Sequence, residues 1–204
     1  MTTDVQQGST RSGGARISRF PLADVRELPT DLRDRILEIG AKTGFVPNIF
    51  LALAHRPDEL RAFLAYHDAV MERDSGLSKV EREMIVVATS AAWDCLYCVV
   101  AHGAILRVRA RDPLIADYLA TNSTQAPVTL RQAALLAYAV KLSTQPQSVS
   151  DADHELLRGH GLTDDDIWDV GAVTAFFSMS NRLAHASGLV PNEEFHLMGR
   201  LPRT

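Results

Sequence analysis

The sequence of 204 residues has very little cysteine: Cys95 and Cys98 are its only two, separated by two residues. It also lacks an excess of basic residues, because its net charge is −4 and its isoelectric point is near 6.0. A charge balance of this kind gives no indication that nucleic acid or an anionic membrane is the main partner. We therefore expect neither as a partner.

Long apolar segments are also missing. No run approaches the roughly 18 apolar residues that a membrane-spanning helix needs. The first 16 residues are mostly polar, rich in glycine and serine, and lack the apolar middle of a signal peptide. We predict a disordered tail over residues 1–16, a single domain over residues 17–204 and a cytoplasmic location, where thiols are kept reduced.

What the chain does contain is a series of helix start and stop signals, without the alternating pattern of strands. Pro57 suits the first position of a helix, and Ser78 with Glu81 has the spacing of a capping box. A cap at Thr163 and a stop at Gly188 indicate a long C-terminal helix. These signals predict an all-α fold of about eight helices in a bundle-like array. Segments 76–92 and 128–142 are faintly alike, which raises the hypothesis of an internal helical repeat.

The cysteine pair lies in the stretch WDCLYCVVAHG, residues 93–103. In a reducing compartment a lone CxxC pair is more typical of catalysis or metal binding than of a structural disulfide. With Asp94 as the N-cap, Cys95 and Cys98 would occupy the first and fourth positions of a helix. Residues three apart share a face, with Cα atoms roughly 5 Å apart, so a reversible disulfide is sterically feasible. The helix start favours a thiolate and the Asp94 carboxylate opposes it.

His102 follows Cys98 by one helical turn on the same face. Its imidazole can take the thiol proton directly or through one water, which favours Cys98 as the nucleophile and Cys95 as the resolving cysteine. The opposite assignment also has a physical basis, because Cys95 lies nearer the helix end. The sequence leaves both assignments open.

Glu83 is predicted to lie on the apolar side of its helix, unlike Glu81 and Arg82. A buried carboxylate is costly unless it is paired, hydrogen-bonded or protonated, which suits a proton carrier. The WD break after this helix would let the next helix fold back and bring Glu83 near the thiols.

Simpler interpretations compete with this one. Two cysteines in a helix can simply pack, and a lone histidine or glutamate is more often structural. A zinc site built from Cys95, Cys98, His102 and Glu83 lacks a second Cys/His pair at knuckle spacing. We therefore expect no metal and no other cofactor.

Glu83, the CxxC pair and His102 together resemble the E-x11-C-x2-C-x3-H signature of the alkylhydroperoxidase D-like (AhpD-like) proteins, in the carboxymuconolactone decarboxylase superfamily. The chain is most similar to the peroxidase-related branch, whose members carry LS…EREMI…SAA…C.YC…H, as here from Leu77 to His102. The segments TGFVPNIFLALAHRP and GLTDDDIWDVGAVTAFFSMSNRLA resemble the same branch. The resemblance covers nearly everything beyond the tail.

The resemblance implies an all-α fold, a homo-oligomer (dimer, trimer or hexamer) and thiol peroxidase chemistry. By position, Cys98 corresponds to the peroxidatic cysteine and Cys95 to the resolving one, with Glu83 and His102 as the proton relay. Tyr97 departs from the best-studied members, which have a histidine there. The decarboxylase branch lacks the CxxC pair, so a lactone substrate is not expected.

We therefore predict a peroxidase that reduces hydroperoxides through a dithiol/disulfide cycle, with an external thiol, protein or small molecule, as reductant. Two alternatives remain. The dithiol could exchange disulfides with a partner as a carrier or sensor, without peroxide. The chain could also be a non-enzymatic helical oligomer that binds a small apolar ligand.

Overall fold

The computed structural model describes residues 16–200, and this part of the chain is all-helical, as the sequence predicts. It contains ten α-helices, of which eight are long, and no strand within the described residues. The tail predicted for residues 1–16 lies, apart from its last residue, outside the described residues. The single-domain boundary at residue 17 stays a prediction.

The α-helices follow one another with short connections, two of which contain a single turn of 3-10 helix, and a third such turn precedes α1. The bounds are α1 (Thr30–Thr43), α2 (Asn48–Leu53), α3 (Pro57–Met71), α4 (Lys79–Ala91), α5 (Leu96–Ala110), α6 (Ile115–Asn122), α7 (Leu130–Thr144), α8 (Asp151–Gly159), α9 (Asp164–Ser187) and α10 (Glu194–Leu197). The 3-10 turns are Val25–Glu27, Ser123–Gln125 and Pro146–Ser148.

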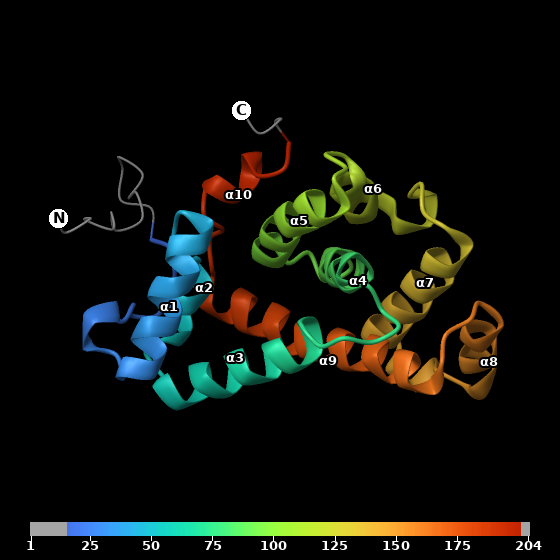
Figure 1. The fold of residues 1–204 in the computed structure, drawn as a ribbon, viewed down its shortest axis with the longest axis horizontal. Coiled ribbons are helices and arrows are strands. Elements are labelled where there is room, and N and C mark those ends of the chain that lie inside the picture. Colours follow the sequence, from blue (N-terminus) through green and yellow to red (C-terminus); the bar gives the residue numbers. More distant parts are fainter. Residues whose placement is uncertain (1–15, 201–204) are drawn as a thin grey trace.

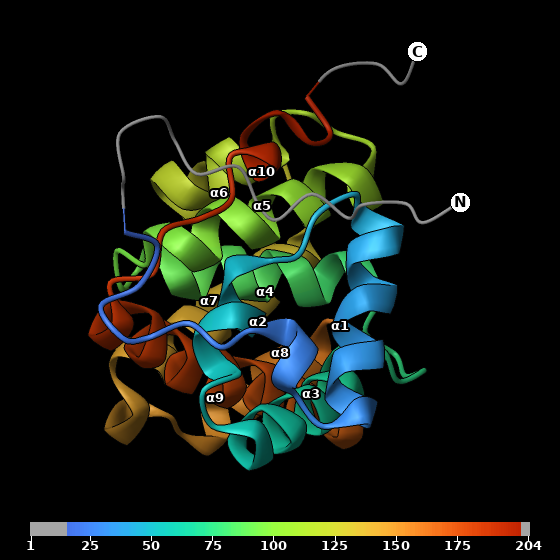
Figure 2. The same ribbon diagram turned by 90° about the vertical axis from the view of Figure 1, so that its left-hand side faces the viewer.

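Helix α4 is the central element of the array. It packs against α5, α6, α7 and α9, which surround it (Figure 1). Every residue of α4 from Glu81 to Ser90 is buried, so most of the main hydrophobic core is built around this helix. A second, smaller core lies under α1 and α3, on the side of the molecule that faces the viewer in Figure 2.

The helix boundaries follow the predicted capping signals. Ser78 and Glu81 form a reciprocal capping box at the start of α4, and Pro57 is the first residue of α3. Thr163 caps α9, which ends at Gly188 in the left-handed conformation. Each cap satisfies backbone N–H groups that the helix itself leaves unpaired, and such a cap contributes about 1 kcal/mol.

The structure corrects the predicted cap at Asp94. Asp94 has a φ of 52°, in the left-handed region, and Cys95 takes the N-cap position of α5. The cause is the tight turn after α4, in which the N–H of Asp94 donates to the carbonyl of Ala91 and the N–H of Cys95 to that of Ser90. The two cysteines are still three residues apart, but each sits one position closer to the start of the helix.

Arg82 also differs from expectation, because its side chain is completely buried. Its guanidinium donates to Asp169 Oδ2 of α9 at 2.8 Å and to the backbone carbonyl of Val70 at 2.6 Å. The side chain therefore joins α4 to α9 and to the end of α3. Apolar periodicity cannot show such a pairing, because the partners are distant in the sequence.

None of the helices in residues 16–200 is both long enough and apolar enough to cross a membrane.

Candidate active site

The two cysteines lie at the start of α5, where they are 1% and 2% exposed. They approach each other to 3.1 Å and are not joined by a disulfide. Apolar side chains around them form a small separate core, which includes Phe45, Ala184 and Leu189. The turn and the first turn of α5 thus place two thiols within reach of each other in a site that water barely enters.

The thiols have unequal acidity. The thiol of Cys98 donates a hydrogen bond that lowers the pKa of Cys95 to about 7, although burial opposes the shift. The Cys98 amide and the charges of His185 and His102 lower the pKa of Cys95 further. Because the thiols share a proton, the first deprotonation belongs to the pair, and its charge rests mainly on Cys95.

The pKa of Cys98 is raised well above its usual value, first by its hydrogen bond to Cys95 and then by burial. The hydroxyl groups of Ser180 and Ser90 act in the opposite direction, because each lies within hydrogen-bonding reach of the Cys98 sulfur. Neither serine was identified from the sequence. Ser90 comes from the end of α4 and Ser180 from α9, so only the folded chain brings them to Cys98.

Glu83 and His102, the two residues of the predicted proton relay, lie against each other. His102 Nδ1 lies 2.8 Å from Glu83 Oε2, and both side chains are largely buried. The imidazole stacks edge-on against the ring of Phe177 at 4.6 Å between centroids. Since the carboxylate fixes one ring nitrogen, the other, Nε2, is left to exchange a proton.

A third charged residue belongs to this pair. Arg109 Nη1 lies 3.4 Å from Glu83 Oε1, and Arg109 Nη2 donates to Glu72 at 2.8 Å. The sequence shows Arg109 only as a basic residue near a helix C-terminus. Its position seven residues, about two turns, after His102 places it on the same face of α5. That spacing is the signal that could have revealed it.

Two further groups surround the dithiol. His185 Nε2 donates to the backbone carbonyl of Trp93 at 2.8 Å, which holds α9 against the turn before Cys95. Arg182 lies over the Trp93 ring at 5.0 Å from its centroid. Leu96, between the cysteines, is 63% exposed. The dithiol is therefore buried, but the residues beside it reach the surface.

Tyr97, the residue just before Cys98, has a structural role. Its hydroxyl oxygen accepts the N–H of Ile49 at 3.2 Å, which ties the dithiol segment to α2. Burial raises the pKa of Tyr97, so its hydroxyl stays protonated at neutral pH and cannot act as a base. Its contribution is to anchor the segment.

Within residues 16–200, no three or more histidine, cysteine or acidic side chains are grouped so that they could hold a metal ion. Cys95, Cys98, His102 and Glu83 therefore do not form a joint ligand set.

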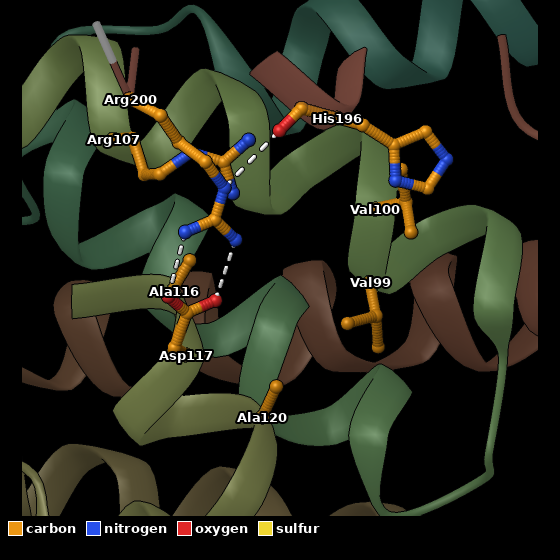
Figure 3. A pocket seen from close by; sticks show the side chains of 8 residues that line it. All are labelled: Val99, Val100, Arg107, Ala116, Asp117, Ala120, His196 and Arg200. Atoms are coloured by element: carbon orange, nitrogen blue, oxygen red, sulfur yellow. Dashed lines mark hydrogen bonds and ion pairs between the residues drawn. The ribbon is translucent and has the colours of Figure 1, made fainter. Parts of the chain in front are cut away.

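A small pocket of about 100 Å³ lies between α5, α6 and α10, and neither cysteine lines it (Figure 3). Its apolar wall includes Val99 and Val100, while Arg107 and Arg200 supply charge. Arg107 donates to the backbone carbonyls of Met198 and Phe195, and Arg200 pairs with both oxygens of Asp117. Both arginines of the pocket therefore already have hydrogen-bond partners within the protein, and none of the proposed reactive groups lines the pocket.

The helical array with a buried dithiol beside a His–Glu pair defines a class of protein, and comparison with known proteins identifies it. The model of the carboxymuconolactone decarboxylase family matches residues 57–137, which include Glu83, both cysteines and His102. The AhpD core of an uncharacterized peroxidase-related protein from Ralstonia eutropha JMP134 is 58% identical, with a TM-score of 0.91. That match covers 93% of this chain and 100% of the other.

An uncharacterized peroxidase-related protein from Silicibacter sp. TM1040 is 38% identical over 94% of this chain and 100% of its own, with a TM-score of 0.87. The debrominase Bmp8 shares the fold at 19% identity and a TM-score of 0.71, over 89% of this chain and 95% of its own. No curated protein is significantly similar to the chain. The chain belongs to the AhpD-like proteins of the carboxymuconolactone decarboxylase family.

Proposed function

We propose that the protein is a thiol-dependent peroxidase that reduces hydroperoxides through a Cys95–Cys98 dithiol/disulfide cycle. The observation that carries the proposal is a single helix, α5, that holds two thiols 3.1 Å apart at its start. One turn later the same helix carries His102, bonded to Glu83 at 2.8 Å. Family membership supports a peroxidase-related role.

The first step is attack by the Cys98 thiolate on the terminal oxygen of the hydroperoxide. The sulfur–oxygen bond forms as the O–O bond breaks, which oxidises Cys98 to a sulfenic acid and releases an alkoxide. The proton that left Cys98 passes through one water to His102, and then to the alkoxide, which leaves as an alcohol. Glu83 stabilises the imidazolium while it holds that proton.

The second step closes the disulfide. The Cys95 thiolate attacks the Cys98 sulfur, the sulfur–sulfur bond forms and the sulfur–oxygen bond breaks. The hydroxide that leaves takes up one proton from solvent, which replaces the proton that Cys95 released when it ionised, and departs as water. An external dithiol, or two molecules of a monothiol, then reduces the disulfide and becomes oxidised itself. The relay and the serine hydroxyls favour Cys98 as the attacking sulfur, whereas the resting charge lies on Cys95.

The proposal also covers the substrate, the reductant, the assembly, the cofactors and the location of the protein. The substrate is a hydroperoxide, the reductant is an external thiol, and the assembly is a homo-oligomer. Neither a metal nor another cofactor takes part, and we place the protein in the cytoplasm. Size-exclusion chromatography with light scattering tests the oligomer directly.

Sulfenic-acid trapping and intact-mass measurement after one equivalent of hydroperoxide test the chemistry. We expect an internal disulfide in the wild type and a trapped sulfenic acid on Cys98 in Cys95→Ser. A sulfenic acid on Cys95 in Cys98→Ser, with none in Cys95→Ser, would reverse the two roles. Unmodified cysteines in all three proteins would rule out the peroxidase.

A disulfide carrier is a second candidate. Two observations favour it: the pKa of Cys95 is close to 7, and Leu96 and Trp93 expose apolar surface beside the dithiol. A thiolate at a site with exposed apolar neighbours suits exchange with a protein disulfide. Comparing the rate constants for a hydroperoxide and for a protein disulfide separates the two functions.

A further inference from the structure

The polar side chains that reach Cys98 from α4 and α9 have no role in the steps above. We propose that Ser90, Ser180 and Asn181 form a hydrogen-bond switch that positions the Cys98 sulfur and stabilises its thiolate. The inference rests on the proposed function, because it assigns positioning residues to the same dithiol.

Ser90 is fixed next to the dithiol by the backbone as well as by its side chain. Its carbonyl accepts the N–H of Cys95 at 3.0 Å and that of Trp93 at 3.3 Å, so the turn into α5 closes on Ser90. Its side chain is completely buried. Ser180 is also buried, and both hydroxyls lie within hydrogen-bonding reach of the Cys98 sulfur. Cys98 therefore has one hydroxyl from each packed neighbour helix.

Asn181 extends this contact away from the sulfur. Its Oδ1 accepts a hydrogen bond from Ser90 Oγ at 3.0 Å. Its Nδ2 is buried and has no hydrogen-bond partner, although the residue is only 1% exposed. A buried donor without a partner is destabilising, which favours a second arrangement in which Nδ2 has a partner.

The hydroxyl of Ser90 carries a single proton and two lone pairs. In the observed arrangement that proton goes to Asn181, so Ser90 has no proton to give to the Cys98 sulfur, and the thiol of Cys98 keeps its own hydrogen bond to Cys95. Rotation of the Asn181 amide by half a turn would direct Nδ2 to Ser90. Ser90 would then accept from Asn181 and donate to the sulfur. The first arrangement suits the Cys98 thiol and the second suits its thiolate.

The switch makes it easier to move the negative charge of the pair from Cys95 to Cys98. Hydrogen bonds from hydroxyls to a charged sulfur are stronger than those to a thiol, so Ser90 and Ser180 favour the charged form. In the second arrangement the amide of Asn181 polarises Ser90 and strengthens its bond. The network thus supports the sulfur that attacks the peroxide.

The test uses Cys95→Ser as the parent, so that Cys98 is the only thiol, and measures its rate of alkylation by iodoacetamide against pH. Adding Ser90→Ala or Ser180→Ala should slow alkylation at pH 7 about tenfold and move the profile up by about one pH unit. Ser178→Ala is the matched control, because Ser178 also lies on α9 but is not part of the network. It should leave the profile unchanged. The ionisable groups around Cys98 are the same in the parent and in these serine variants: His102, Tyr97, His185 and Glu83.

A second variant tests the switch itself. The aspartate of Asn181→Asp can only accept a hydrogen bond, so it keeps the Ser90 proton away from the sulfur. The substitution should therefore slow alkylation more in the parent, where Ser90 is present, than in the Ser90→Ala variant. An aspartate that acts through charge alone would slow both equally, which would overturn the switch. Ser180→Thr, which keeps the hydroxyl, should restore the parent profile, and circular dichroism checks that the helices persist.

Alkylation requires no peroxide, so the two proposals fail separately. Unchanged alkylation profiles in an active peroxidase would overturn the switch alone. Shifted profiles in a protein that never forms a sulfenic acid would support the switch and overturn the peroxidase.

Discussion

Single residues set the chemistry of the dithiol through their immediate neighbours. Cys95 and Cys98 are equally buried, yet the pKa of Cys95 is lowered and that of Cys98 is raised, because one thiol donates to the other. The direction of that hydrogen bond decides which sulfur carries the charge at rest. The hydroxyls of Ser90 and Ser180 favour the charged form of the other sulfur, that of Cys98, and the proposed histidine relay accepts its proton.

The lowered pKa of Cys95 predicts the pH dependence of its alkylation. The thiolate of Cys95 forms as the pH rises through about 7, so iodoacetamide should react faster through that range and reach a plateau above it. Cys98→Ala removes the hydrogen bond and should move the rise to higher pH, toward the usual range near 9. Mass spectrometry identifies the modified residue.

Cys98→Ser provides the matched control, because its hydroxyl still donates to Cys95 and should keep part of the shift. Identical profiles in the wild type and in Cys98→Ala would show that Cys98 does not activate Cys95.

Some site residues could be predicted from the sequence and others could not, for a physical reason. The spacing of Cys98 and His102 on one helix indicates a shared face, and the apolar surroundings of Glu83 indicate that it points inward. Ser90 and Ser180 are ordinary small residues in Ala-rich helices. Only the packing of α4 and α9 against α5 gives their hydroxyls a partner.

At the scale of elements, the turn between α4 and α5 controls where the dithiol lies. The turn requires Asp94 to adopt a φ of 52°, and sequence spacing alone suggested an ordinary cap at this position. Asparagine and aspartate tolerate this region, whereas β-branched residues do not. The sequence signal for a helix start was correct, but the capping residue is Cys95.

Asp94→Val should destabilise the fold by about 1–2 kcal/mol, because valine resists the left-handed conformation. Asp94→Asn, which tolerates it, should change the free energy of unfolding by less than about 0.5 kcal/mol. Urea denaturation followed by circular dichroism measures both. Equal stability of the two variants would mean that the turn imposes no such conformation.

Helix α5 carries three parts of the candidate site along its length: the dithiol at its start, His102 one turn further and Arg109 in its last turn. Arg109 links Glu83 to Glu72, and Glu72 also pairs with Lys79 at the surface. This ionic chain holds the Glu83 carboxylate in place on the side opposite His102. Arg109 is therefore a positioning residue for the relay.

Arg109→Gln should lower the rate of hydroperoxide reduction about tenfold, because Glu83 loses one of its two partners and is held less firmly. Arg111→Gln is the matched control, since Arg111 is an exposed residue just past the end of the same helix. Peroxide consumption with excess dithiothreitol, measured against pH, follows the effect. Equal rates for the two variants would remove Arg109 from the relay.

At the scale of the whole molecule, the central helix α4 contributes Glu83 and Ser90 to the site and packs against four other helices. The all-α architecture was predicted correctly because capping boxes and apolar periodicity are local signals. The two short helices, α2 and α10, have too few residues for a periodic pattern. The buried contact between Arg82 of α4 and Asp169 of α9 joins residues that are 87 positions apart. A pattern of neighbouring residues cannot show such a contact.

Asp169→Ala should destabilise the protein by about 3–5 kcal/mol, because it leaves the buried guanidinium of Arg82 without its carboxylate. Asp164→Ala, at the start of α9, breaks an exposed pair with Arg158 of α8 and should cost less than about 1 kcal/mol. Chemical denaturation gives both values. A loss below 1 kcal/mol for Asp169→Ala would show that this ion pair does not hold α4 to α9.

The rate of disulfide formation after one equivalent of hydroperoxide, compared between the wild type and Glu83→Gln, tests the central claim most directly. We predict that the wild type closes the Cys95–Cys98 disulfide and that Glu83→Gln does so roughly a hundredfold more slowly, since its relay no longer stabilises a proton on His102. Equal rates in the two proteins, or a wild type whose thiols stay reduced, would contradict the account.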